Sequence, residues 1–296
     1  MEPMRRPVFK NPEINQKFEQ LGFVLLPPLE DSKLVELEHT FRHTDGKDHS
    51  KQGWYNSSHD KDLNVNRMIS KNIIKHIEPD ILSFLDNYRS VVGAFLFKRG
   101  NSDGMVKPHA DWALTDERFG CGLSAFLPIH RVDETTGCLW VVPGSHKLVE
   151  LNRGHAPGQV TGWACVEELV FQHAIPIILT PGEILMMDNR LVHSSMPMKN
   201  ENGERILISC GFIPLDQLNL HFSECFRDEW GSVFRVYQVD DAFYLDTERR
   251  LHPGGYYSCL GYRRQPSADV DLRDTLSVLQ EAQMKAQKAL TLKSYI

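Results

Sequence analysis

The spacing of hydrophobic positions changes twice along the 296-residue chain. In the first third, apolar residues recur at the helical interval of three and four positions, and one such segment opens on Asp31 and Ser32, which are good helix caps. The pattern predicts helices over residues 12–21, 31–44 and 68–87, and a short strand over 22–27. Residues 45–66 are polar, which predicts an exposed segment that can fold over the mouth of the domain.

The middle of the chain has a different pattern of short β-rich runs bounded by Gly, Pro and Asn. These runs predict strands over residues 91–99, 121–130, 138–143, 175–180, 183–188 and 205–214. Many short strands without interleaved helices are typical of a sandwich or barrel. We therefore expect a mainly β fold, a jelly roll of roughly eight strands with room inside for one small ligand.

The last part of the chain predicts little regular structure before its end. Residues 251–264 look loop-like, and residues 271–290 have the pattern of an amphipathic helix. We expect this helix to pack on the outside of the barrel, with a homodimer contact as the alternative. The chain is interpreted as a single domain over residues 1–296. It consists of leader helices and a lid segment (1–90), a jelly-roll core (about 91–215) and a C-terminal extension with its helix (216–296).

The composition of the chain argues against some classes of binding partner. There are 33 basic and 39 acidic residues, a formal net charge of −6, and this acidic excess argues against a nucleic-acid partner. No apolar stretch follows the N-terminal arginines, and no apolar run reaches the ~18 residues of a membrane span. The six cysteines form no C-x-x-C pair and are interpreted as reduced core thiols. Together these features predict a cytoplasmic protein with a small-molecule substrate and no membrane or nucleic-acid partner.

His109, Asp111 and His193 are the candidate metal ligands. His109-Ala110-Asp111 follows the strand over 91–99, and residues i and i+2 of a strand point the same way. The third ligand is expected from His193, in the segment PGEILMMDNRLVHSS. Two histidines and one carboxylate on one face of a metal leave open positions, which is the arrangement of non-haem iron(II) oxygenases. The H-x-D pair alone is a weak signal, because thirteen histidines give many chance pairs.

Arg205 supplies the second part of the pattern, since it lies twelve residues after His193 and opens the next predicted strand. A buried guanidinium is a planar fork that matches a carboxylate. Iron(II), Asp111, the dianion 2-oxoglutarate and Arg205 have formal charges that sum to zero. Ser195 points the same way as His193 and could donate to the same carboxylate. We therefore expect iron(II), 2-oxoglutarate and dioxygen as cofactor and cosubstrates.

Several of these segments together resemble the phytanoyl-CoA dioxygenase family of iron(II)- and 2-oxoglutarate-dependent oxygenases. They are KFEQLGFVLLPPL near the start, H-A-D at 109–111, ETTGCLWVVPGSHK at 134–147, PGEILMMDNRLVHSS at 181–195, and Arg205. The resemblance covers roughly residues 15–215, and GCLWVVPGSHK is its most specific part. It implies a double-stranded β-helix (cupin-like jelly roll), iron ligands at His109, Asp111 and His193, and 2-oxoglutarate held by Arg205 and Ser195.

The resemblance also implies further contacts and a reaction. Phe126 matches an aromatic position against the cosubstrate, and Arg67 matches a basic residue that reaches it. Halogenating relatives replace the carboxylate ligand by a small residue, so Asp111 favours hydroxylation or a related oxidation, with release of succinate and carbon dioxide.

The residues themselves suggest substrate contacts. Trp112 follows the metal carboxylate, Trp54 and Asn56 lie on the polar segment, and Lys98 ends the strand before H-x-D. No phosphate-cradling glycine loop or basic cluster is present for a CoA-sized anion, which favours a small polar metabolite. Two other classes stay open. One is a cupin-like metalloenzyme of another reaction, such as a lyase or isomerase. The other is a catalytically silent relative that acts as a binding protein.

Overall fold

Three antiparallel sheets and five α-helices make up the part of the chain that the computed structural model describes, residues 6–44, 54–100, 104–149, 151–154, 172–200, 202–266 and 272–291. The helices are α1 (Pro12–Leu21), α2 (Asp31–Thr44), α3 (Leu63–Phe84), α5 (Thr247–Leu251) and α6 (Leu272–Thr291). The 3-10 turns are η2 (Ser57–His59), η3 (Ser145–Lys147), η5 (Asp241–Leu245) and η6 (Pro253–Gly255). The strands are β1 (Phe23–Leu26), β2 (Trp54–Asn56), β3 (Tyr88–Arg99), β4 (Val106–His109), β5 (Leu123–Pro128), β6 (Leu139–Val141), β7 (Ile175–Ile177), β8 (Ile184–Asp188), β9 (His193–Ser195), β10 (Glu204–Pro214), β11 (Leu220–Asp228), β12 (Gly231–Gln238) and β13 (Cys259–Pro266).

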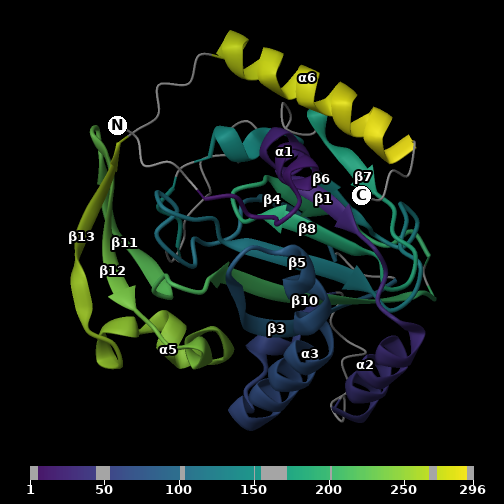
Figure 1. The fold of residues 1–296 in the computed structure, drawn as a ribbon. Helices are drawn as coiled ribbons and strands as arrows, with labels where there is room; N and C mark the ends of the chain where they lie inside the picture. The colour runs from purple at the N-terminus through teal and green to yellow at the C-terminus, as the bar shows by residue number, and fades with distance from the viewer. Residues whose placement is uncertain are drawn as a thin grey trace.

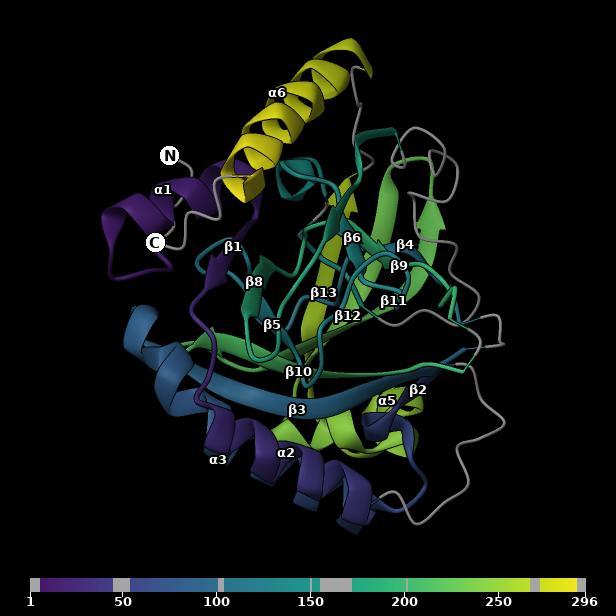
Figure 2. The ribbon, with the colours of Figure 1, turned by 90° about the vertical axis from the view of Figure 1, so that its right-hand side faces the viewer.

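Two of the sheets form the predicted jelly roll. The major sheet has the order β1-β8-β5-β10-β3-β2, and the minor sheet has the order β4-β9-β6-β7. Figure 2 shows the minor sheet standing over the inner face of the major sheet, with α2 and α3 beneath the outer face. The expected mainly β, cupin-like fold is confirmed.

Alternation along the long strands separates two cores. Phe95 and Phe97 on β3 point outward and pack in one cluster with Ile73 and Ile77 of α3. Leu96, between the two phenylalanines, packs instead with the cluster inside the barrel. Each strand of the major sheet therefore offers every second side chain to the interior, which is where polar chemistry can be placed.

The leader helices form where the sequence caps them. The Asn11 side chain accepts hydrogen bonds from the backbone N–H groups of Glu13 (2.8 Å) and Ile14 (3.3 Å), and α1 ends at Gly22, whose φ is +81°. The helices predicted over 12–21 and 31–44 are confirmed with the same bounds. The third begins earlier than predicted, at Leu63, because the Asp62 carboxylate caps it.

The C-terminal sheet is the main departure from the expectation. Residues 251–264 are not simply a loop, since β13 begins at Cys259 and pairs with β12, while β12 pairs with β11. Most of β13 is exposed or half-buried, so its pattern reads as polar, and its partner strand lies more than twenty residues away in the sequence. Figure 1 shows this sheet along one side of the barrel.

The C-terminal helix packs on the outside of the barrel, as expected. Leu279 lies in a small cluster with Val142 and Val192, and Ala286 packs with the residues of the barrel interior and minor sheet. Figure 1 shows α6 on the side of the molecule opposite α2 and α3. The homodimer contact through this helix stays a prediction.

Two composition-based expectations have separate outcomes. Cys121, Cys138 and Cys210 are buried thiols, but Cys225 and Cys259 are exposed on the C-terminal sheet, so the interpretation of all cysteines as core residues is wrong. Cys165 lies outside the described residues. Within the ranges given above, no helix combines the length and apolar character that crossing a membrane would require.

Candidate metal centre

The side chains of His109, Asp111 and His193 converge at the end of the minor sheet. His109 ends β4, His193 opens β9, and the two residues are paired in the ladder. Asp111 lies two residues beyond β4, with Oδ1 at 3.7 Å from His109 Nε2 and 3.8 Å from His193 Nε2. In the described part of the chain this is the one group of three or more such side chains that could hold a metal ion.

Both imidazoles are oriented by backbone carbonyls. Nδ1 of His109 lies 2.8 Å from the carbonyl oxygen of Lys107, and Nδ1 of His193 lies 3.0 Å from that of Leu191. A carbonyl only accepts, so each Nδ1 carries the proton and donates it. Each Nε2 therefore keeps its lone pair and faces the common point, as histidine ligands of a metal do.

Ser124 orients the carboxylate. Its hydroxyl donates to Oδ2 of Asp111 at 2.8 Å, and the same Ser124 Oγ lies 2.9 Å from Oδ1 of Asn189. The amide of Asn189 in turn donates to the carbonyl of Trp112 at 3.2 Å. With Oδ2 held on one side, Oδ1 is left to face the two imidazoles.

The backbone of Asp111 is held by a buried ion-pair network. Arg153 donates from Nε to the Asp111 carbonyl at 2.8 Å, and its other nitrogens contact both oxygens of Glu117, at 2.6 and 2.9 Å. Arg190 lies 3.8 Å from Glu117 and also pairs with Asp188. Each buried charge in this network has an opposite partner, which lowers the cost of burying it.

The protonation state of His193 suits a metal ligand. Burial, and after it the neighbouring His109, lower the pKa of His193 to about 4. The imidazole is therefore neutral at pH 7, which is the form that binds metals. Two imidazoles and one carboxylate on one side of a common point match the facial arrangement of a non-haem iron(II) site, so the residues fit that metal.

Arg205 and Ser195 form a second polar site inside the barrel. Arg205 is 3% exposed, and its NH1 group donates to the carbonyl of Gly137 at 2.5 Å and to Ser195 Oγ at 3.0 Å. Its Nε atom is buried and has no hydrogen-bond partner. Gly137 has a φ of +73°, and a Cβ there would lie 2.7 Å from the Met196 carbonyl, so this close approach requires glycine.

Lys98 lies beside this arginine and not at a surface where a substrate would first meet it. It pairs with Arg205 in the β3–β10 ladder and is fully buried. Its Nζ donates to Ser195 Oγ (2.7 Å), to the Ser195 carbonyl (3.1 Å) and to the Met196 carbonyl (2.8 Å). The structure therefore brings Lys98, Ser195 and Arg205 together.

Of the other predicted cosubstrate residues, one lies near the metal group and one does not. Phe126 is buried on the inner face of β5, with its ring centroid 6.0 Å from that of His193. Arg67 is exposed on α3, whose buried side packs on the outer face of the major sheet. Arg67 thus lies on a helix outside the major sheet, and its contact with the cosubstrate stays a prediction.

The remaining predicted substrate residues have structural contacts. Asn56 accepts a hydrogen bond from the backbone N–H of Ser58 and so caps η2, while Trp54 packs edge-on against His59. Trp112 follows Asp111 but packs with the cluster under the C-terminal sheet, 5.6 Å from the ring of His221. Of these three residues, only Trp112 directly follows a member of the metal group in the sequence.

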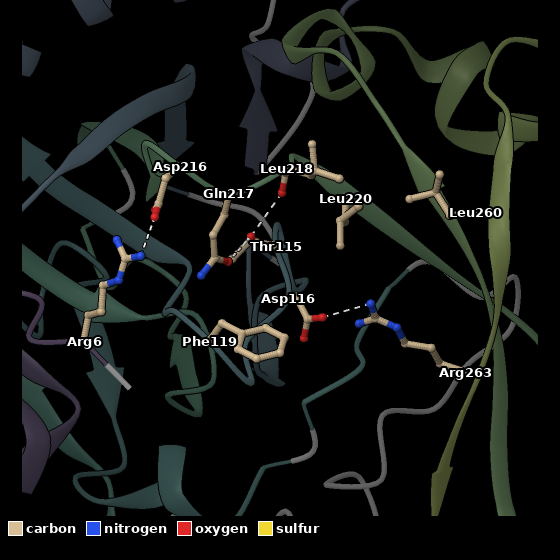
Figure 3. A pocket seen from close by; sticks show the side chains of 10 residues that line it. All are labelled: Arg6, Thr115, Asp116, Phe119, Asp216, Gln217, Leu218, Leu220, Leu260 and Arg263. Atoms are coloured by element: carbon tan, nitrogen blue, oxygen red, sulfur yellow. Dashed lines mark hydrogen bonds and ion pairs between the residues drawn. The ribbon is translucent and has the colours of Figure 1, made fainter. Parts of the chain in front are cut away.

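A cavity of about 410 Å³ lies away from the metal group, between the loop after Trp112 and the C-terminal sheet. Figure 3 shows that its polar groups are paired with one another. Asp116 contacts Arg263 at 2.9 Å, Arg6 contacts Asp216 at 2.5 Å, and Thr115 donates to Gln217 at 2.6 Å. Most of its polar groups are therefore already paired, and NH1 of Arg263 is buried without a hydrogen-bond partner.

Four residues that the sequence interpretation missed support the metal group. Ser124 lies two positions before Phe126 and so shares its strand face, and Asn189 lies inside the segment that contains His193. The sequence positions of these two residues could therefore have identified them as neighbours of the site. Glu117 and Arg153 offered no such signal, because their pairing joins segments 36 residues apart.

Comparisons with known proteins give the family and the fold of the chain. A model of the phytanoyl-CoA dioxygenase family matches residues 13–206, a range that contains all three candidate ligands and Arg205. The fold is similar to that of the non-heme alpha ketoglutarate dependent carbocyclase SnoK from nogalamycin biosynthesis (15% identity, TM-score 0.53, covering 71% of this chain and 86% of that chain). It is also similar to EctD from S. alaskensis, solved with 2-oxoglutarate and 5-hydroxyectoine (15% identity, TM-score 0.50, covering 74% and 84%). The chain belongs to the phytanoyl-CoA dioxygenase family of iron(II)- and 2-oxoglutarate-dependent oxygenases.

Proposed function

We propose that this protein is an iron(II)- and 2-oxoglutarate-dependent dioxygenase that hydroxylates, or otherwise oxidises, a small organic substrate. The observation that carries the proposal is the convergence of His109, Asp111 and His193 on one point, with the buried cation of Arg205 inside the same barrel. When bound, iron(II) with 2-oxoglutarate and dioxygen supplies the oxidising power and releases succinate and carbon dioxide.

The protein's part is to hold and orient these groups. Nε2 of His109, Nε2 of His193 and Oδ1 of Asp111 would bind the metal, and their backbone and Ser124 contacts keep them in place before it arrives. Arg205 would bind the distal carboxylate of 2-oxoglutarate through the side of its guanidinium that Gly137 and Ser195 do not use. Phe126, buried with its ring beside that of His193, would help exclude water from the cosubstrate.

Asp111 favours hydroxylation over halogenation. A carboxylate ligand occupies the metal position that a halide would need. Ser124 and Arg153 both hold Asp111, one through its side chain and one through its carbonyl. The metal group is therefore built around that carboxylate.

The substrate class rests on the surroundings of the metal group. Trp112 follows Asp111, and no glycine-rich phosphate loop accompanies the site. The structures similar in fold include one solved with 5-hydroxyectoine and one from nogalamycin biosynthesis. A small polar metabolite or a natural-product intermediate is the proposed substrate class.

Anaerobic titration tests the proposal. Iron(II) and then 2-oxoglutarate are added to the protein, and a weak visible charge-transfer band is expected as the cosubstrate chelates the metal. Asp111→Ala should abolish the band and the succinate release, while the exposed Asp216→Ala in the separate cavity should leave both unchanged. Absence of the band in the unmodified protein would favour a cupin-like metalloenzyme of another reaction. A band without succinate release, under any substrate screened, would favour a silent binding relative.

A further inference from the structure

Two buried basic side chains share one hydroxyl in the barrel interior. Ser195 Oγ accepts a hydrogen bond from Lys98 Nζ at 2.7 Å and from Arg205 NH1 at 3.0 Å, and it donates to the Gly137 carbonyl at 3.0 Å. All the acceptors around these two side chains are neutral oxygens. The pair therefore has hydrogen-bond partners but no compensating charge among them.

No carboxylate of the described residues forms an ion pair with either Lys98 or Arg205. This differs from the network beneath Asp111, where Arg153 and Arg190 each contact a buried acid. Two positive charges side by side in this desolvated site would be costly without an anion, so the second charge is favoured only when an anion joins the pair. The arrangement is that of a site built to receive a negative charge from outside the chain.

We infer that Lys98 supplies a second positive charge, beside Arg205, to the site that holds the distal carboxylate of 2-oxoglutarate. This inference rests on the proposed function. It reassigns Lys98 from the substrate to the cosubstrate, and it predicts that the site selects a 2-oxo acid by the charge at its far end.

The electrostatics of the lysine agree with this role. Burial, followed by repulsion from Arg205, lowers the pKa of Lys98 to about 6. Of the other neighbours, burial raises the pKa of Cys138 to about 11, so that thiol is neutral, and Ser195 and Met196 do not titrate. An arriving carboxylate would favour the protonated amine, so binding of the dianion at neutral pH should take up a proton.

A purely structural role for Lys98 is the competing explanation. Its three hydrogen bonds tie β3 to β9 and the following residue, and loss of that tie could loosen the whole site. The two roles differ in one respect. A structural tie serves every ligand of the site, whereas a second charge serves only a ligand with a distal carboxylate.

The test therefore compares two ligands on the iron(II)-loaded protein without oxygen. 2-Oxoglutarate is set against 2-oxopentanoate, which has the same chain length but no distal carboxylate, with the charge-transfer band as the measure of binding. Lys98→Met should weaken 2-oxoglutarate binding by roughly 10- to 100-fold and leave 2-oxopentanoate binding unchanged. The control Lys199→Met, at an exposed lysine a few residues beyond Ser195, should change neither.

Equal weakening of both ligands, or of neither, would overturn the inference. If the unmodified protein gives no band with 2-oxoglutarate, the proposed function fails, and the inference fails with it. If Lys98→Met does not fold, the affinities of the unmodified protein for both ligands are measured between pH 7 and pH 8.5 instead. There the affinity for 2-oxoglutarate should fall with rising pH, by up to about tenfold per unit, and more steeply than that for 2-oxopentanoate. If the two affinities depend on pH in the same way, the inference that Lys98 supplies a second charge is overturned.

Discussion

Ser124 donates its hydroxyl to Oδ2 of Asp111 at 2.8 Å and thereby turns Oδ1 of that carboxylate toward the two histidines. The contact joins the major sheet to the loop after β4. Because a rotating carboxylate would lose entropy on binding a metal, a hydroxyl that already holds it makes the site ready for the ion.

Ser124→Ala should therefore weaken metal binding without removing a ligand. We expect the affinity for iron(II) to fall roughly 10- to 100-fold, as for other residues that orient metal ligands. Equilibrium titration with iron(II) under anaerobic conditions measures this, and Ser223→Ala on the C-terminal sheet serves as the matched control. Unchanged affinity in Ser124→Ala would show that Asp111 is oriented by its other contacts alone.

Arg205→Met should weaken 2-oxoglutarate binding and leave metal binding intact. Burial lowers the pKa of Arg205 to about 10, so the guanidinium is still charged at pH 7. Removing a buried charge that binds a carboxylate costs about 2–5 kcal/mol, roughly 30- to several-thousand-fold in the dissociation constant. Parallel titrations with iron(II) and with 2-oxoglutarate separate the two effects, and the exposed Arg227→Met is the control. A loss of iron(II) affinity of the same size would mean that Arg205 supports the fold of the metal group instead.

Asp188→Asn should reduce stability in a pH-dependent way. Burial alone would raise the pKa of Asp188, but the adjacent Arg190 outweighs it and holds the pKa at about 2, below the ordinary value of 3.8. A lowered pKa contributes stability above pH 3.8 that is lost as the pH falls toward 2, and the shift corresponds to about 2 kcal/mol. Urea unfolding between pH 6 and pH 2.5 should show the unmodified protein losing this increment while Asp188→Asn does not.

The exposed Asp86→Asn should follow the unmodified protein through the same pH range. If Asp188→Asn also lost stability with falling pH as the unmodified protein does, the Asp188–Arg190 pair would contribute nothing to the pH dependence of stability. Glu117, whose pKa is raised by burial, works in the opposite direction, so only the difference between the two proteins isolates Asp188.

The described cysteines should divide into two classes by reactivity. Cys225 and Cys259 are exposed and should react with a thiol reagent in the folded protein. Burial raises the pKa of Cys121, Cys138 and Cys210, which keeps them as unreactive thiols until the chain unfolds. Mass spectrometry of the labelled peptides reads each site separately. Rapid labelling of Cys210 would show that the major sheet opens more easily than its packing indicates.

Much of the fold followed from local pattern. Asn11 and Gly22 bound α1, and the β-rich run over residues 91–99 predicted most of β3. The C-terminal sheet did not follow, because β13 keeps few buried residues and its partner is distant.

The sequence by itself determined the residue types of the metal group and Arg205, because H-x-D, a later histidine and a strand-opening arginine are local features that chemistry constrains. Only the tertiary structure decided what surrounds them. Ser124 reaches Asp111, Arg153 reaches its carbonyl, and Lys98 joins Arg205 at Ser195. These contacts join strands and loops far apart in the chain. They depend on sheet register and burial, which the spacing of residues within one segment does not determine.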